Sequence, residues 1–518
     1  MLKKKNIKLN AILSALNSCF SILFSLITYP YAVRVLGVEN IGKISYTASI
    51  IAYFSLIAML GIRTYAIREG AKLKDNPIEF KKFTAQMFTI NMLSTVIAYA
   101  CLALFILCIS SLQNYLWLLL IQSGTMLLTT LSVDWINNIY EDFLHITLRS
   151  FFAHAVGIVF LFVFVKKPED YLLYASINIV VNLVICISNL IYTRKYVKLS
   201  FTTKLDFKKH IKPILIFWAN AVAVTIYVSV DTTMLGVIRG AMLGTAQGEL
   251  EVGLYSIAVK VYTIVKTILA AIYAVALPRL VSYFNSEDRE RGKILYTRLS
   301  SSLILLLFPC VLGLMCLSEE VIYLISGEVL TGAVASLQIL SFALLFAILG
   351  GLVTGCLNVA IGREKDNLIS SIIAAATNLV LNIIFIPWLG FYGAAITTII
   401  AEFVVFIYCF IRIPNKKQYL LLKEVGVSTL HAFVGCIPIV LITLLVRHFF
   451  TSVFLRIALI MLGSVLVYSL ILLAFRDKNF LSLFEFAKKK KTSSCQVENE
   501  SEEKEQEEIK IEDKEENN

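Results

Sequence analysis

Charged side chains interrupt several long apolar stretches of this chain. Lys260 and Lys266 lie in one such stretch, and Asp134, Asp231 and Glu402 lie in three others. A charge near the middle of a bilayer costs on the order of 2.5–3.5 kcal/mol, so charges that persist there usually face protein or water. An ammonium group in such a place can offset an anion, and a carboxylate can bind H⁺ or Na⁺. A salt bridge to the following helix explains Asp231 equally well.

Small polar residues recur at helical spacing in the same stretches. One stripe near the N-terminus consists of Ser14, Asn17, Ser18, Ser21, Ser25 and Thr28. A second contains Asn367, Ser371, Asn378 and Asn382, and a third joins Lys260 to Ser256, Thr263 and Thr267. Such stripes either line a hydrated cavity or form hydrogen bonds between helices. The sequence leaves both interpretations open.

Four further basic residues lie near the ends of apolar stretches. We expect Arg34 and Lys43 at the outer end, and Arg63 and Arg149 at the inner end. Arg34 and Lys43 can extend into the headgroup region or contact a ligand. Arg63 and Arg149 can orient the chain or meet an anion that enters from the cytoplasmic leaflet.

The elements that must position these residues are membrane helices. The chain has 518 residues, of which 58% are hydrophobic and only 16% charged, whereas soluble domains are about 25% charged. We predict about fourteen spans: 11–33, 41–62, 84–108, 115–137, 145–165, 171–193, 211–236, 252–277, 298–317, 333–358, 368–388, 392–412, 424–446 and 453–475. Each is close to the roughly 20 residues that cross a bilayer, and none alternates as a barrel strand would. The fold class is therefore an all-α polytopic membrane protein.

Basic residues fill every second gap between the spans. Lys72 and Lys74, the segment 194–212, and Lys488 to Lys491 fall in gaps predicted to be cytoplasmic. The positive-inside rule then places both termini in the cytoplasm, with Ser200 inside and Gly327 outside. The first span is full length and is followed by many others, so we predict that it is retained rather than cleaved.

The two halves of the chain resemble each other. Residues 34–69 match 233–282, and 139–175 match 360–395 more weakly; both matches are offset by about six spans. An even offset predicts repeats of the same orientation, related by an axis along the membrane normal. The predicted organisation is an N-terminal six-helix lobe (1–200), a C-terminal six-helix lobe (201–415), two additional helices (416–480) and a disordered charged tail (481–518).

Several short motifs resemble those of one known family. They are Arg34-x-Leu36-Gly37 with Gly42, Gly61-Ile62-Arg63, Asp231-Thr232-Thr233-Met234-Leu235-Gly236, Gly253-Leu254-Tyr255-Ser256, Leu277-Pro278 and the run Pro387 to Ala395. In this order and spacing they are similar to the Wzx-type oligosaccharide flippases. This family belongs to a superfamily with the multidrug (MATE) antiporters and the lipid II flippases. The resemblance covers residues 1–480; the acidic tail departs from it.

The resemblance implies two six-helix, MATE-like lobes and a function in cell-surface polysaccharide biosynthesis. Undecaprenyl-diphosphate-linked oligosaccharide would cross the cytoplasmic membrane by alternating access, without a cofactor or a metal. The expected partners are membrane lipids, a coupling H⁺ or Na⁺, and the polymerase and glycosyltransferases of the pathway. The substrate-binding candidates are Arg34, Asn17, Ser21, Arg63, Arg149, Lys260, Lys266 and Asn378. The coupling-ion candidates are Asp231, Glu402 and Asp134.

Rival functions make different demands on the sequence. A MATE-like drug or cation antiporter should favour acidic cavity residues, whereas Lys260 and Lys266 favour an anionic head group. A lipid II or teichoic-type flippase is a close variant of the main hypothesis. A membrane glycosyltransferase or polymerase usually needs a large external loop, and none is predicted. No Walker A motif, nucleophile–base set or Cys/His metal cluster is evident, so we predict that the chain is not an enzyme.

Overall fold

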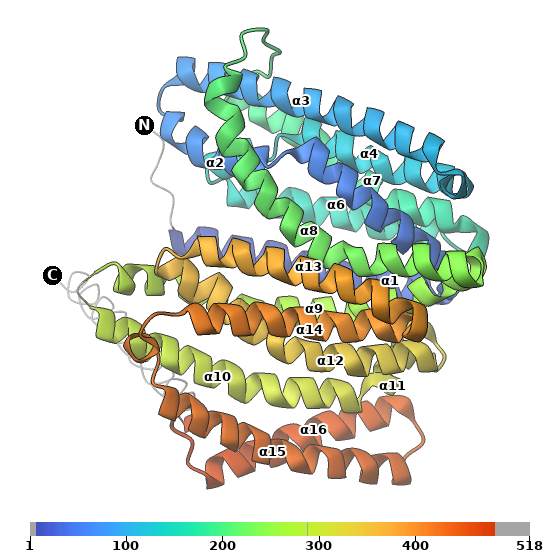
Figure 1. The fold of residues 1–518 in the computed structure, drawn as a ribbon, viewed down its shortest axis with the longest axis vertical. Coiled ribbons are helices and arrows are strands. Elements are labelled where there is room, and N and C mark those ends of the chain that lie inside the picture. The colour runs from blue at the N-terminus through green and yellow to red at the C-terminus, as the bar shows by residue number, and fades with distance from the viewer. Residues whose placement is uncertain (1–6, 287, 482–518) are drawn as a thin grey trace, which may run out of the picture. The chain divides into compact units, whose positions relative to one another are not determined.

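The computed structural model describes residues 7–286 and 288–481, and the regular structure in this part of the chain is helical, without a strand (Figure 1). The first helices are α1 (Ile7–Met59), α2 (Ile62–Leu73), α3 (Pro77–Cys108), α4 (Leu116–Ser132), α5 (Trp135–Ile139), α6 (Phe143–Phe164) and α7 (Tyr171–Tyr192). They are followed by α8 (Phe207–Leu243), α9 (Thr245–Phe284), α10 (Arg289–Cys316), α11 (Ser318–Ser326), α12 (Thr331–Leu352), α13 (Glu364–Leu389), α14 (Phe391–Arg412), α15 (Leu422–Phe449) and α16 (Val453–Ala474). The predicted disordered tail lies outside the described residues from residue 482 onward.

Short helical turns connect some of these elements. They are the 3₁₀ turns η1 (Ser110–Tyr115), η2 (Pro168–Asp170), η3 (Thr193–Lys195) and η5 (Lys416–Gln418), and the π-helical turn η4 (Val353–Asn358). The chain forms two compact units. The first comprises the described residues of Met1–Ile268, Leu317–Thr354 and Gly362–Arg412. The second comprises those of Leu269–Cys316, Gly355–Ile361 and Ile413–Asn518.

The number of membrane crossings agrees with the sequence-based prediction. Within the described residues, 13 helical stretches are long and apolar enough to cross a membrane, and the first of them, Ile12–Leu73, has 62 residues. At about 1.5 Å per residue, this stretch is roughly three times the thickness of a bilayer core. Gly37 divides α1 with φ 80° and ψ 164°, a backbone conformation that suits glycine. The two segments of α1 then supply the first two predicted spans, so the all-α fold of about fourteen spans is confirmed.

One predicted span ends earlier than expected. The prediction continued the fourth span to residue 137, but α4 ends at Ser132, and Val133 has a left-handed backbone with φ 40°. The short helix α5 follows, anchored by Trp135 and Ile136 in an apolar cluster with residues of α2 and α3. This break places Asp134 between two spans rather than inside one.

In the first unit, α1 packs against α3, α4, α6 and α8, and α13 packs against α8 and α14. Figure 1 shows these helices running side by side. One end of the first unit carries η3, the segment that follows it and α5. Val197 and Leu205 of that segment pack in the same apolar cluster as Trp135 of α5. We name this the inner end, after its predicted orientation. The opposite, outer end carries the break at Gly37, and there Asn40 donates to the Pro168 carbonyl at 3.1 Å. In the second unit, α15 packs against α10 and α16.

Gly42 and Gly253 hold equivalent positions when residues 34–69 are matched to 233–282, and the two glycines meet each other at the outer end. A Cβ atom added at Gly42 would lie 1.8 Å from the Glu249 carbonyl oxygen. A Cβ atom added at Gly253 would lie 2.1 Å from the Val38 carbonyl oxygen. Gly42 therefore packs on the carbonyl four residues before Gly253, and Gly253 packs on the carbonyl four residues before Gly42. A two-fold axis produces such a reciprocal contact. The crossing of α1 and α9 supports the predicted pseudo-symmetry of the repeats.

Candidate functional site

A polar cavity of about 410 Å³ lies at the inner end of the first unit. Its walls come from α1, α2, α3, α4, α5, α6 and α7. They include four predicted site residues, namely Asn17, Arg63, Asp134 and Arg149. These residues are up to 132 positions apart in the sequence, and only the packing of the helices brings them together. Three more asparagines, Asn91, Asn138 and Asn182, lie in the same wall, together with several serine and threonine residues.

Asp134 is the centre of an ionic cluster in this cavity. Its Oδ2 accepts a hydrogen bond from Nη2 of Arg63 at 3.0 Å, and its Oδ1 accepts one from Nη2 of Arg149. The Asn138 amide donates to Oδ2 at 3.2 Å. Burial alone would raise the pKa of Asp134, but the guanidinium groups of Arg149 and then Arg63 outweigh burial and hold this pKa below its ordinary value. Asp134 is thus a carboxylate at neutral pH. At that pH it can take up a proton only after its contacts with Arg63 and Arg149 open.

Arg149 is buried more deeply than its charge would lead one to expect. The residue is 7% exposed, and its Nε and Nη1 atoms donate to no protein atom in the described part of the chain. The Oδ1 atom of Asn17 in the same cavity is likewise buried without a hydrogen-bond partner there. Buried polar groups are nearly always hydrogen-bonded, so these atoms indicate a ligand or ordered water.

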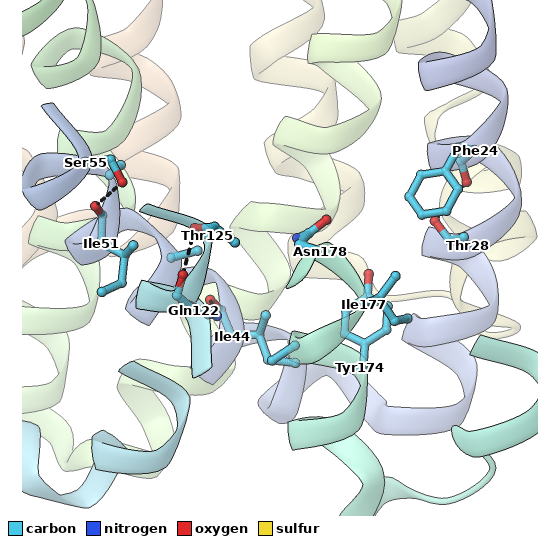
Figure 2. A pocket seen from close by; sticks show the side chains of 13 residues that line it. Phe24, Thr28, Ile44, Ile51, Ser55, Gln122, Thr125, Tyr174, Ile177 and Asn178 are labelled. Carbon is cyan, nitrogen blue, oxygen red and sulfur yellow. Dashed lines mark hydrogen bonds between the residues drawn. The ribbon is translucent and has the colours of Figure 1, made fainter. Parts of the chain in front are cut away.

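A second cavity, of about 250 Å³, is lined by both segments of α1, by α4 and by α7. Figure 2 shows Thr28 and Asn178 on one side of it and Ser55, Gln122 and Thr125 on the other. The hydroxyl groups of Ser55 and Thr125 donate to carbonyls of their own helices at 2.8 and 2.7 Å. The 13 residues that line this cavity in the described structure include no charged one.

Three hydroxyl groups of the polar stripe predicted in 11–33 form hydrogen bonds within their own helix. Ser18, Ser21 and Thr28 donate to the carbonyls of Ser14, Asn17 and Phe24, each four residues earlier. The interpretation that the stripe forms hydrogen bonds between helices therefore does not hold for these three hydroxyl groups. Asn17 and Thr28 line the two cavities, whereas Ser21 lines neither.

Lys260 lies on α9 and faces the aromatic ring of Tyr29 on α1. Its Nζ atom is 5.5 Å from the ring centroid, and no ion pair of Lys260 occurs in the described residues. The Tyr29 hydroxyl is buried and also has no hydrogen-bond partner there. A cation–π contact leaves the ammonium group able to bind an anion.

Lys266 differs from Lys260, because its charge is already paired. Its Nζ atom lies 2.5 Å from Oε1 of Glu402 on α14, and the Tyr262 hydroxyl donates to the same oxygen at 2.9 Å. Glu402 is only 5% exposed. Two predicted site residues, assigned to substrate and to coupling ion respectively, thus form one ion pair, in which the carboxylate is buried and the ammonium group is partly exposed.

We expect Lys266→Ala to destabilise the protein, because it leaves the Glu402 carboxylate buried without its cation. An unpaired buried group of this kind costs roughly 1–3 kcal/mol or more. The apparent melting temperature in detergent, followed by fluorescence size-exclusion chromatography, should fall by several degrees. The double variant Lys266→Met with Glu402→Gln should recover most of the loss, because no charge then remains buried. An unchanged melting temperature in Lys266→Ala would contradict this structural role.

Asp231 on α8 lies in a buried polar cluster with α9, α13 and α14. It accepts hydrogen bonds from Asn382 at 2.7 Å, Thr398 at 2.7 Å and the Tyr255 hydroxyl at 2.9 Å. Asn382 also donates to Oδ1 of Asn378 at 3.2 Å. No ion pair of Asp231 occurs in the described residues, so the alternative of a salt bridge to the next helix is wrong for this structure.

The donor set around Asp231 suits a proton or a hard monovalent cation. Carboxylate, amide and hydroxyl oxygens are the ligands that such cations prefer. The carboxylate and the side-chain oxygens of Asn378, Asn382 and Thr398 could turn toward one ion, with rotation of the Asn382 amide. Asn378 thus lies beside Asp231, a coupling-ion candidate, although the sequence analysis assigned Asn378 to the substrate. Sequence reasoning did not select Thr398, because a threonine in a membrane helix carries no distinctive signal.

Arg34 has a structural contact at the outer end. Its guanidinium donates to the Leu324 and Ile325 carbonyls at 2.5 and 3.3 Å, in the last turn of α11. A cation there compensates the free carbonyls of a helix C-terminus. Lys43 lies nearby in the fold and pairs with Glu39 at 2.8 Å and with Glu249 at 3.6 Å. Neither residue lines the two cavities described above.

Comparison with known proteins agrees with this geometry. A family model described as polysaccharide biosynthesis protein matches residues 7–284, which is more than half of the chain. The chain belongs to this family. Among curated proteins, none matches the chain.

Comparison with solved structures identifies the fold of this chain. A structure of the lipid II flippase MurJ in an inward closed conformation superposes with a TM-score of 0.70 at 18% identity, covering 90% of this chain and 99% of that one. An inward-facing multidrug resistance MATE family transporter gives 0.51 at 16% identity, over 76% and 98%. A MATE protein in complex with MaL6 gives 0.52 at 15% identity, over 78% and 94%. The protein therefore has the MurJ and MATE fold and is a multi-pass membrane protein.

Proposed function

We propose that the protein is a flippase that moves polyprenyl-diphosphate-linked oligosaccharide repeat units from the inner to the outer leaflet of the cytoplasmic membrane. It would work by alternating access of its lobes (1–200 and 201–415), with both termini in the cytoplasm, as a transporter and not as an enzyme. Support comes from the family, which is one of polysaccharide biosynthesis proteins, and from the fold, which a lipid II flippase shares.

The observation that carries the proposal is the charge of the polar interior. The inner cavity holds Arg63 and Arg149 against a single carboxylate, Asp134, and no charged residue lines the second cavity. Lys260 lies against an aromatic ring, and no ion pair of Lys260 occurs among the residues that the structure describes. Such an interior attracts an anionic head group and its sugars, whereas a cation exporter needs acidic walls. The apolar polyprenyl tail can remain in lipid during the passage.

Asp231 and its neighbours are the proposed site of the coupling ion. The cluster is buried, rich in oxygen and separate from the arginines of the inner cavity. Binding of H⁺ or Na⁺ there would neutralise Asp231 and change the packing of α8 against α13. Glu402 and Asp134 are weaker candidates, because each is already paired with a basic residue.

Deletion of the gene with complementation tests this function. We expect the deletion strain to lose its surface polysaccharide and to accumulate lipid-linked repeat units, and the wild-type protein to reverse both effects. Drug susceptibility in the same strains distinguishes the MATE-like antiporter. Rescue of a strain depleted of its lipid II flippase distinguishes that variant. Normal polysaccharide in the deletion strain, together with increased drug sensitivity, would overturn the proposal in favour of the antiporter.

A further inference from the structure

Gln122 on α4 lines the second cavity with a buried oxygen that no protein group satisfies. Its Nε2 donates to the Ile44 carbonyl at 3.1 Å, so the amide cannot turn over without placing its own oxygen against that carbonyl. Its Oε1 accepts no hydrogen bond within the described residues, although Gln122 is only 8% exposed. A buried acceptor of this kind is costly unless a donor reaches it. A donor that enters the second cavity removes this cost.

Two polar side chains of α7 are available in the same cavity. Neither the Asn178 amide nor the Tyr174 hydroxyl forms a hydrogen bond among the described residues. Figure 2 shows both on the side of the cavity that faces Gln122. The three serine and threonine hydroxyl groups of the lining donate to carbonyls of their own helices, and their oxygens can still accept. The second cavity therefore offers hydrogen-bond donors and acceptors, none of them charged.

This lining selects an uncharged ligand that is rich in hydroxyl groups. None of its 13 residues carries a charge, so a phosphate or a drug cation would enter without a counter-charge. A hydrocarbon chain would leave the Gln122 oxygen unsatisfied. The rings of Phe24 and Tyr174 have faces of partial negative charge, which attract the C–H groups of a sugar ring. The volume of about 250 Å³ lies below the roughly 300–1,000 Å³ of pockets for drug-sized ligands and suits one sugar of a longer chain.

We propose that the second cavity is a subsite for one uncharged sugar residue, in which a hydroxyl or acetamido N–H group of the sugar donates to Oε1 of Gln122 while Asn178 and Tyr174 hold its other polar groups. The inference rests on the proposed function, because it names the part of the oligosaccharide that this cavity recognises. Helices α1, α4 and α7 line both cavities, and on each of them the second cavity takes residues farther from the inner end. A sugar chain that enters at the inner end can reach the subsite along these helices.

Such a subsite discriminates between sugars. A site built to hydrogen-bond a hydroxyl or N–H group rejects an analogue that lacks this group, because the polar groups of the site then stay unpaired. Gln122 contributes most to this selection, since its oxygen is buried and has no other donor in the described residues. Gln122 and Asn178 are therefore specificity-determining residues in this proposal.

The test is binding of an oligosaccharide to the purified full-length protein in nanodiscs of neutral lipid, measured by saturation-transfer NMR, which detects weak ligands. The probe is the repeat-unit oligosaccharide obtained by depolymerising the surface polysaccharide of the source strain. We expect Gln122→Ala to weaken binding at least about tenfold, and Asn178→Ala to weaken it about threefold to tenfold. Asn178 has no hydrogen-bond partner in the described protein, so its loss should not affect folding. Ser176→Ala is the matched control on α7, since Ser176 donates to the Leu173 carbonyl and does not line the cavity. It should bind as the wild type does.

A second arm separates the sources of the sugar. Polyprenyl-diphosphate-linked oligosaccharide added to the nanodiscs should displace the free oligosaccharide, whereas polyprenyl diphosphate without sugars should leave it bound. If neither lipid displaces it, the free oligosaccharide is the ligand and the subsite stands. Equal displacement by both lipids would overturn the subsite. Absence of binding to the wild type, or equal binding by the wild type, Gln122→Ala and Asn178→Ala, would also overturn it. The proposed flippase function would survive each of these results, because export of polysaccharide is measured independently.

Discussion

Lys260→Ala is expected to abolish export of the polysaccharide while the protein accumulates in the membrane at the wild-type level. Lys260 contacts the ring of Tyr29 and has no carboxylate partner in the described structure. The cation–π contact contributes only about 0.5–2 kcal/mol, so its loss should not unfold a bundle of this size. The passing diphosphate, in contrast, loses an ammonium group whose positive charge offsets its own.

Three variants make this prediction specific. Lys260→Arg should retain part of the activity, because it keeps the charge and changes the geometry. Lys260→Met should behave as Lys260→Ala, since a long side chain without a positive charge cannot offset the diphosphate. Lys266→Ala on the same helix serves as a comparison, because its loss should appear as reduced stability. Surface polysaccharide and protein level are measured in parallel. Normal export by Lys260→Ala would show that the cationic route does not pass this residue.

The second large effect is expected at the crossing of α1 and α9. Gly253→Val should reduce export more than tenfold, because its Cβ would lie 2.1 Å from the Val38 carbonyl oxygen, a separation that atoms do not adopt without movement of the backbone. The two helices must then separate at this crossing. Gly42→Val should have the same effect, because its contact with the Glu249 carbonyl is the symmetry-related one.

Accessibility of a buried reporter measures this opening. Val252 is 0% exposed beside Gly253, so a Val252→Cys reporter in an otherwise cysteine-free protein should react with an impermeant maleimide only when the crossing opens. We expect rapid labelling in Gly253→Val and slow labelling in the parent. Gly240→Ala is the control, since its Cβ would meet nothing within 4 Å. Slow labelling and full export in both glycine variants at the crossing would contradict the role assigned to it.

Much of the fold follows from local features of the sequence. Apolar length predicts the helices, and alternating basic gaps predict their number, because each depends only on neighbouring residues. The equivalence of Gly42 and Gly253 was also visible in the repeat. The structural reason for this equivalence could not be predicted, since only the folded chain shows the two glycines packing together. The break at Val133 was missed because nothing in the residue type predicts a left-handed backbone there.

The site was less predictable, because charge pairing depends on contacts over long distances in the sequence. Lys266 and Lys260 look alike as lysines six residues apart. In the described residues, however, Glu402 forms its ion pair with Lys266, from which it is 136 residues away, and not with Lys260. The sequence allows a ligand contact for Arg34 as readily as for Arg149, but in the structure Arg34 donates to backbone carbonyls of α11. The stripe of asparagines correctly brought Asn378 and Asn382 together, and Asp231 joins them from another helix.

Translocation by the purified protein in proteoliposomes tests the central claim most directly. Vesicles are loaded with a polyprenyl-diphosphate-linked oligosaccharide on one leaflet, and its appearance on the other is followed with an impermeant sugar-cleaving enzyme. The wild-type protein should expose the oligosaccharide at a rate far above that of empty vesicles, and Lys260→Ala should be close to the empty vesicles. If the wild-type protein, folded and correctly inserted, gives no more exposure than empty vesicles under H⁺ and Na⁺ gradients, it is not a flippase for this class of lipid.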